Sequence, residues 1–287
     1  MNILHISDLH FGSRHWNGNN EMLLEKLNSY SADIVINTGD STTDALESEF
    51  EAARKFLHSI KCEHVISIVG NHDKRNMRSQ DFFQEYINKV DIIYPQNPEN
   101  CTKNKLLLDE KTIGVKEKFT DINFINRISI NGETILVVCL DTNELYSDNG
   151  YVDKEVLLSV SNEIDKLSYD QIILLNHHSI LETDSDPLFN SSRVIDFINK
   201  YNIHHVFCGH THKLSLIKSI DLLHQYSFTQ YKNGTLTSHS HPSDTNMFLF
   251  YENVGQKEMT IKIIKINIDG DNLIFKEEVI GSDQLVL

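Results

Sequence analysis

Short apolar segments alternate along most of the chain with longer segments of helical periodicity. The apolar segments are mostly rich in Ile and Val and are bounded by Gly, Asp or Asn, a pattern typical of buried strands. They cover Ile3–Ile6, Ile34–Asn37, Val65–Val69, Ile135–Leu140, Ile172–Leu175 and His205–Cys208. We therefore predict six buried strands in this part of the chain.

The segments between these strands carry apolar residues at helical spacing. In Ser192–Tyr201, for example, Val194, Ile195, Phe197 and Ile198 share one helical face. The predicted helices cover Glu21–Ser29, Leu46–Ser59, Ser79–Lys89, Lys154–Leu167 and Ser192–Tyr201. Because strands alternate with helices, we predict a layered α/β fold.

The chain contains no internal repeat and no evident linker, so we expect residues 1–287 to form a single domain. Residues 91–120 are polar, and we predict an irregular surface excursion there. From about residue 215 the pattern changes to strands and turns, including Lys257–Asp269 and Asn272–Val279. This β-rich extension is expected to add to the domain in antiparallel fashion.

Asp, Asn and His side chains follow most of the predicted strands. The segments are Ser7–His10, Thr38–Asp40, Gly70–Asp73, Asn176–His178 and Gly209–His212. Ligands bind at the carboxyl ends of strands in open α/β sheets, so we expect these side chains to converge. Asp8 and His10 lie two positions apart, as do His210 and His212. In extended backbone the members of each pair would point the same way.

This donor chemistry indicates a metal site. Imidazole and carboxylate together suit borderline divalent ions such as Zn, Mn, Fe or Ni. The donors at the strand ends exceed what one ion needs. Two ions that share a bridging carboxylate are therefore the predicted cofactors.

The spacing of these residues resembles the five-block signature of the calcineurin-like metallophosphoesterases. The blocks are Asp8-x-His10, Gly39-Asp40, Gly70-Asn71-His72-Asp73, His177 and Gly209-His210-x-His212, in the order found in that family. Any one block is common by chance, whereas all five in order are not. The resemblance implies an αββα fold, in which a two-sheet sandwich is flanked by helices.

The resemblance also implies a role for each position. Asp8, His10 and His212 would hold one metal, Asn71, His177 and His210 would hold the other, and Asp40 would bridge them. His72 would contact the substrate phosphate and assist departure of the leaving oxygen. Two ions roughly 3.5–4 Å apart can clamp an in-line displacement at phosphorus, and a water held between them is expected to attack as hydroxide.

One segment suggests the substrate class. Gly70–Arg75 resembles the form of this block in the class III cyclic-nucleotide phosphodiesterases, as do Leu140–Thr142 and Gly150–Val152. The resemblance implies a small phosphodiester substrate, with 3′,5′-cyclic nucleotides as the leading candidate. Arg75 and His178 are the candidate substrate contacts. A single Arg is about as often a solvated surface residue, and His178 could instead support His177.

Two departures from the family pattern leave the subfamily open. Many relatives carry an acidic residue three positions after the bridging Asp, whereas here the acid is Asp44, one position later. Many relatives also carry Pro where this chain has Ser179. Neither departure removes a predicted metal ligand.

Three other functions are open at this point: a phosphomonoesterase, including a protein or nucleotide phosphatase; a nuclease; and a non-catalytic scaffold of the same fold. The chain has 26 Lys and Arg against 41 Asp and Glu, a formal net charge of −15. That charge repels long nucleic acids and anionic membranes, and no basic stripe offsets it. Scaffold relatives lose ligands, whereas every ligand position is filled here.

The remaining sequence features give weaker expectations. The four cysteines show no CxxC spacing, and the N-terminus lacks a signal-peptide pattern, so we expect a cytoplasmic protein that contacts no membrane. Isolated histidines elsewhere, such as His5, are interpreted as packing or surface residues. His15, Trp16, His239 and His241 could line the mouth of the site or be ordinary loop residues.

Overall fold

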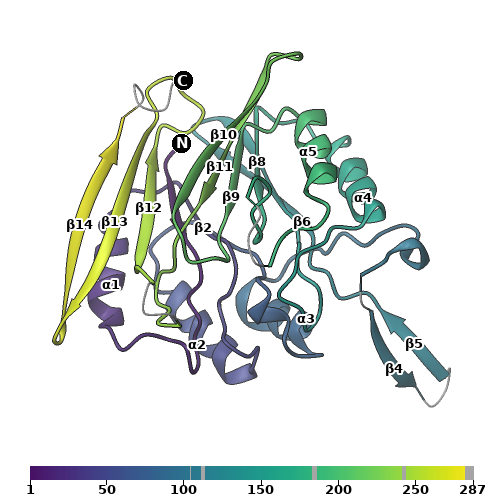
Figure 1. The fold of residues 1–287 in the computed structure, drawn as a ribbon, viewed down its shortest axis with the longest axis horizontal. Coiled ribbons are helices and arrows are strands. Elements are labelled where there is room, and N and C mark those ends of the chain that lie inside the picture. The colour runs from purple at the N-terminus through teal and green to yellow at the C-terminus, as the bar shows by residue number, and fades with distance from the viewer. Residues whose placement is uncertain (104, 111–113, 183–185, 241–243, 282–287) are drawn as a thin grey trace.

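Two six-stranded sheets form the centre of the molecule (Figure 1). The computed structural model describes residues 1–103, 105–110, 114–182, 186–240 and 244–281. The strand order is β14-β13-β12-β1-β2-β3 in the first sheet and β10-β11-β9-β8-β7-β6 in the second. A separate two-stranded sheet consists of β4 and β5.

The first sheet contains the three N-terminal strands, β1 (Ile3–Ile6), β2 (Ile34–Asn37) and β3 (His64–Ser67). These three strands are parallel, with β1 between β2 and a strand from the C-terminal part of the chain. The C-terminal strands are β12 (Met247–Glu252), β13 (Thr260–Asp269) and β14 (Asn272–Ile280), and each pairs antiparallel with its neighbour.

The second sheet is built in a similar way around three parallel strands. These are β7 (Glu133–Cys139), β8 (Gln171–Leu175) and β9 (His205–Cys208). The strands β6 (Phe124–Ile130), β10 (Ser215–Asp221) and β11 (Tyr226–Lys232) complete it. In both sheets the parallel strands bring the loops at their carboxyl ends to one edge, and the predicted donors lie in these loops.

Helices cover the second sheet on the face opposite the first sheet. In β7, Leu136 and Val138 pack in one apolar cluster with α4 (Lys154–Ile164) and α5 (Ser191–Lys200). The alternate residues Ile135 and Val137 belong instead to the larger core shared with the first sheet.

Apolar residues of α1 (Asn20–Leu27) and α2 (Glu47–Leu57) join that larger core, together with the short α3 (Ser79–Phe82) and the π-helical turn Phe83–Ile87. Short 3-10 turns cover His72–Lys74 and Pro98–Asn100. The predicted fold class, sheets flanked by helices in an α/β protein, is confirmed.

The structure corrects three predictions. The segment 91–120 is not irregular throughout, because β4 (Leu106–Glu110) and β5 (Gly114–Lys118) form a hairpin that projects from the body (Figure 1). The strand β6 was not predicted; only its two end residues are buried, so its sequence lacks an apolar run. In the C-terminal extension, β11 pairs with β9 in parallel, not antiparallel as expected.

Among the residues that the structure describes, no helix combines the length and apolarity that crossing a bilayer requires.

Candidate metal centre

The predicted donors converge from both sheets. Asp8 and His10 follow β1, Asp40 follows β2 and Asn71 follows β3; His177 follows β8, and His210 and His212 follow β9. The first five of these side chains are buried, and the last two are partly buried. The site therefore lies across the junction of the two sheets.

Most of the donors sit in strained backbone. Positive φ angles occur at Asp8 (55°), His10 (49°), Asp40 (52°), His210 (80°) and His212 (57°). Left-handed backbone is uncommon for residues other than Gly, and such strain clusters at functional sites. We expected Asp8 and His10 to share a direction through extended backbone, and that expectation was wrong. Left-handed turns aim these side chains instead.

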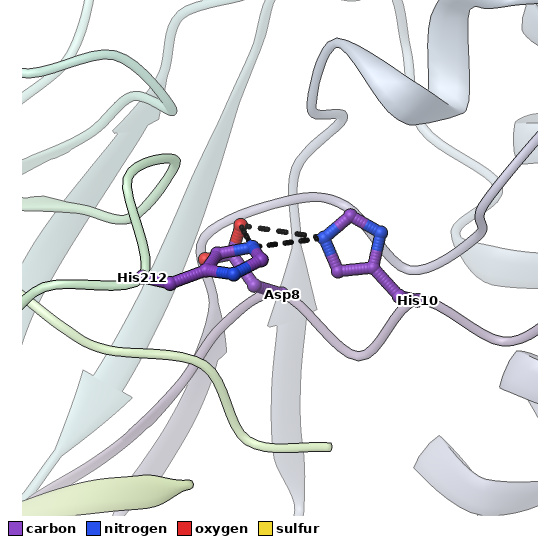
Figure 2. Close-up of side chains that lie close together, drawn as sticks. All are labelled: Asp8, His10 and His212. Carbon is purple, nitrogen blue, oxygen red and sulfur yellow. Dashed lines mark hydrogen bonds and ion pairs between the residues drawn. The ribbon is translucent and has the colours of Figure 1, made fainter. Parts of the chain in front are cut away.

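One group of donors comprises Asp8, His10 and His212 (Figure 2). The Nε2 atom of His212 lies 3.4 Å from Asp8 Oδ1 and 3.0 Å from the Nε2 atom of His10. The His10 Nε2 atom lies 3.9 Å from the same carboxylate oxygen. Three potential ligand atoms thus face one point.

A second group comprises Asn71, His177 and His210. The Asn71 Oδ1 atom lies 3.0 Å from His177 Nε2 and 3.1 Å from His210 Nδ1. The Asp40 carboxylate stands between the two groups, because its Oδ2 atom is 3.6 Å from His10 Nε2 and 3.4 Å from His177 Nε2. Asp40 therefore lies between the two groups, within reach of a donor from each.

The chemistry of these atoms fits a cation. His177 Nδ1 faces the Thr38 carbonyl at 2.7 Å and must donate to it, so the Nε2 atom of neutral His177 has no proton. That lone pair faces two oxygen atoms, of Asn71 and Asp40, which also lack protons. In addition, the buried Oδ1 atom of Asp8 has no hydrogen-bond partner. A metal ion among these atoms would turn unfavourable contacts into coordination.

Without a cation, protons must offset the carboxylates. Burial alone would lower the pKa of His177, but Asp40 and Asp8 outweigh burial and raise it to about 9. At His212 burial is likewise outweighed, here by the hydrogen bond to Asp244 and the nearby carboxylate of Asp8, and the pKa rises to about 10. Burial acts to raise the pKa of Asp40, yet the neighbouring histidines hold it well below its usual range. In the metal-free site, protonated His177 therefore faces ionised Asp40, and protonated His212 faces ionised Asp8. The protons of these two rings lie where a metal ion would bind.

His72 lies beside this cluster, and its ring centroid is 4.6 Å from that of His10. Its backbone N–H donates to Asp40 Oδ1 at 2.8 Å, and its Nδ1 donates to the Thr43 carbonyl at 2.6 Å. The Nε2 atom must then accept a hydrogen bond, and Arg14 donates it at 3.0 Å. Both ring nitrogens are engaged by the protein in this structure. His72 also forms, with His10 and Asp40, a group whose potential ligand atoms lie within 4.8 Å of one another. Its role as a neighbour of the ligands, and not a ligand itself, stays a prediction.

Asp73 has a structural role in the same block. Its carboxylate accepts hydrogen bonds from the backbone N–H groups of Gly70, Ser41 and Thr42, which ties the loop after β3 to the loop after β2. Burial, and then the charge of Asp40, raise the pKa of Asp73 to about 7.

Two glycines are needed for this packing. A Cβ atom on Gly70 would lie 2.1 Å from Asp40 Oδ1, and one on Gly209 would lie 1.9 Å from Ser7 Oγ. No other residue type leaves room for the donors at these two positions.

The two predicted substrate contacts are engaged within the protein. Arg75 donates to Asp148 Oδ1 at 2.8 Å, and the same oxygen accepts from the Asn71 side-chain amide at 2.8 Å. His178 is buried, with Nε2 3.0 Å from the Asp148 carbonyl and Nδ1 2.8 Å from Thr142 Oγ1. In this structure Arg75 thus supports the orientation of Asn71, and His178 packs beside His177 and His210.

The four candidate mouth residues differ in position. His15 stacks on Phe11 with ring centroids 4.2 Å apart, and the buried Trp16 donates to Asn20 at 2.8 Å, so both pack within the protein. His239 is exposed. His241 lies outside the described residues.

Three residues near the site escaped the sequence analysis: Arg14, Asp148 and Asp244. Asp244 Oδ2 lies 3.1 Å from His212 Nδ1, and 32 residues separate the two along the chain. Residues this far apart in sequence share no helical or strand periodicity, so the contact could not be predicted from the sequence pattern. Arg14 follows His10 by four positions, and its charge so close to a ligand block was the one available signal.

Fold and site together define an α/β protein with a metal-binding site of histidines and carboxylates. The family model described as calcineurin-like phosphoesterase matches residues 1–214. The chain belongs to this family. No curated protein sequence matches the chain.

Solved structures agree on the fold. GAP50, the anchor in the inner membrane complex of Plasmodium, is 10% identical over 98% of this chain and 88% of its own, with a TM-score of 0.55. The 5′-nucleotidase from Candida albicans SC5314 is 13% identical over 92% of this chain and 51% of its own, with a TM-score of 0.51. Wild-type Vps29 complexed with Zn²⁺ from Entamoeba histolytica is 14% identical over 98% of this chain and 99% of its own, with a TM-score of 0.46. The first two of these structures have TM-scores above 0.5 and share the fold of this chain, and identities this low show nothing more.

Proposed function

We propose that the chain hydrolyses small phosphodiesters with two divalent transition-metal ions, and that 3′,5′-cyclic nucleotides are its substrate class. The observation that carries the dinuclear part is the position of Asp40. Its Oδ2 atom lies 3.6 Å from a donor of one group and 3.4 Å from a donor of the other. A carboxylate in that position serves both ions at once.

The metals, His72 and Asp40 would have different roles in this reaction. Bound metals would lower the pKa of a water and offset the charge of the phosphate. The Thr43 carbonyl fixes the ring of His72, so that Nε2 is its only nitrogen able to exchange a proton with a leaving oxygen. Asp40 accepts from the His72 backbone at 2.8 Å, which couples this ring to the proposed bridging ligand.

Charge supports a small substrate. The net charge of −15 leaves no track for a long polyanion, which would need several Lys or Arg contacts along its backbone. The basic residues nearest the donors in sequence are Arg14, Lys74, Arg75 and the exposed Lys213. Lys74 is buried and its Nζ atom binds Asp141 at 2.8 Å, so it does not face a ligand. The preference for a cyclic nucleotide rests on the resemblance of residues 70–75.

A turnover screen tests the proposal. The protein would be loaded with Mn²⁺ and assayed on bis-p-nitrophenyl phosphate, p-nitrophenyl phosphate, 3′,5′-cyclic AMP, and single-stranded and duplex DNA. We expect hydrolysis of the artificial diester and of the cyclic nucleotide, and its loss in Asp40→Asn. The matched control is Asp165→Asn, because Asp165 directly follows α4 and its carboxylate contacts Tyr201 and Lys200, which belong to no donor block.

Each other outcome selects a different function. Monoesters turned over far faster than any diester would indicate a phosphomonoesterase. Efficient DNA cleavage with cyclic nucleotides left intact would indicate a nuclease. Full metal content with no turnover of any ester would leave the non-catalytic scaffold.

A further inference from the structure

Arg14 is the cationic side chain that the structure places against His72. Its NH1 group lies 3.0 Å from His72 Nε2, on the ring whose centroid is 4.6 Å from that of the proposed metal ligand His10. Only the His72 ring therefore lies between the guanidinium and the proposed metal ligand His10. The sequence analysis assigned it no role.

The backbone holds Arg14 in place from two sides. Its N–H donates to Thr43 Oγ1 at 3.3 Å, and its carbonyl accepts from the N–H of His239 at 3.1 Å. The turn that presents Arg14 begins at Gly12, which has a φ of 125°. A Cβ atom there would lie 2.0 Å from Glu49 Oε1, so only Gly fits. The position of the guanidinium thus follows from a defined turn.

The guanidinium has capacity for another partner. Within the described ranges, Arg14 makes no ion pair with a carboxylate, and the neutral ring of His72 is its one side-chain partner. Arg75 differs, because it binds Asp148 at 2.8 Å. A guanidinium carries five N–H donors, and its strongest partners are carboxylate and phosphate. Arg14 is partly buried in a chain of net charge −15, and no carboxylate of the described residues pairs with it, which leaves its guanidinium suited to an added anion.

We propose that Arg14 binds a non-bridging oxygen of the substrate phosphate. This inference rests on the proposed function, since it names a residue that recognises the substrate of that site. A phosphate oxygen is a better acceptor for a guanidinium than a neutral imidazole nitrogen is. Substrate would therefore draw the guanidinium away from His72 and leave Nε2 of that ring beside the phosphate. Arg14 then both binds the anion and uncovers the catalytic nitrogen.

The experiment compares the wild type with Arg14→Gln and Arg14→Lys. The charge control is Arg78→Gln, because Arg78 is exposed and stacks on Phe82 at 4.4 Å. The dissociation constant of inorganic phosphate would be measured calorimetrically with Mn²⁺-loaded protein. KM and kcat for bis-p-nitrophenyl phosphate, metal content and melting temperature would be measured in parallel.

Arg14→Gln is expected to weaken phosphate binding and raise KM by about 10- to 100-fold, the range for loss of a charged hydrogen bond. Metal content and melting temperature should stay at the wild-type values. The phosphate dissociation constant and KM of Arg14→Lys should lie between those of the wild type and Arg14→Gln, because Lys keeps the charge but not the planar arrangement of donors. Arg78→Gln should match the wild type.

Two results would overturn the inference: unchanged phosphate affinity in Arg14→Gln, or a fall in kcat alone, which would make Arg14 only a positioning residue for His72. A wild type that binds no phosphate also overturns it. The phosphate measurement is independent of turnover. Suppose that the wild type hydrolyses no ester but binds phosphate, and that Arg14→Gln does not bind it. The proposed function then fails, whereas the role of Arg14 in binding phosphate stands.

Discussion

Asp244 lies beside His212, with Oδ2 of the acid 3.1 Å from Nδ1 of the ring. A carboxylate at this distance accepts a hydrogen bond from Nδ1–H and orients Nε2 toward Asp8 and His10. Asp244 falls outside residues 1–214, the part of the chain that the family model matches. The C-terminal part of this chain thus orients a ligand that the family-matched part supplies.

Asp244→Ala should weaken metal binding by about 10- to 100-fold, as expected when a carboxylate that orients a metal-binding histidine is lost. Competition with a chromogenic chelator would give the affinity. Asp221→Ala is the matched control, because Asp221 makes a similar contact of 2.7 Å with the exposed His224. Equal affinities in the two variants would contradict the role of Asp244.

His72→Ala should keep both metals and lower turnover by ~10²–10⁴-fold, the range for loss of a group that assists proton transfer. The physical reason is that His72 adjoins the donors while the protein engages both of its ring nitrogens. Elemental analysis and kcat would be measured on the same preparation. Loss of metal in this variant would mean that His72 is a ligand.

Asp40→Asn should weaken both metal sites together, because one carboxylate faces donors of both groups. We expect about two transition-metal ions per wild-type chain after Mn²⁺ loading, in accord with two-metal sites that share a carboxylate. Stoichiometry by elemental analysis and affinity by titration would check this. A variant that kept one tight site would show that Asp40 belongs to a single ion.

The metal-free protein should lose stability between about pH 6.5 and 10. The folded-state pKa values of His177 (about 9) and His212 (about 10) exceed the unfolded value of 6.5. Groups with a raised pKa stabilise the fold fully below the unfolded pKa, and that contribution is lost as pH rises through the folded pKa. Denaturant unfolding in EDTA at pH 7 and pH 9 would measure the difference.

Metal affinity should change with pH in the opposite direction to the stability of the metal-free protein, over the same pH range. Metal binding must displace the protons on His177 and His212, so the apparent metal affinity should rise with pH. Calorimetry in two buffers of different ionisation enthalpy would detect the released protons. Affinity that does not change between pH 7 and 9 would contradict the assignment of these two ligands.

The sequence was informative where chemistry and chain position coincide. Asp8, Asp40 and Asn71 directly follow apolar strands, so their shared location could be predicted from the topology of parallel strands. Asp244 and Arg14 could not be found in this way, since their contacts depend on how distant loops fold back. The hairpin of β4 and β5 was missed for another reason. It projects from the body and lacks the alternation of a half-buried strand.

The backbone at the donors was also beyond prediction. The left-handed φ angles at Asp8 and His10 cost energy locally, and pattern analysis assumes the unstrained extended form. The packing of the two sheets holds these turns. Prediction from the residues alone therefore brought these side chains to one place, but through a wrong local geometry.

The division of the donors between the two sheets has a consequence for the lifetime of the folded state. Asp8, Asp40 and Asn71 belong to one sheet, whereas His177 and His210 belong to the other. A cation held by both groups would act as a reversible cross-link between the layers, and the sheets could not separate until it dissociated. Unfolding of the loaded protein should then be slow and limited by metal release, and a chelator should both accelerate unfolding and lower the equilibrium stability.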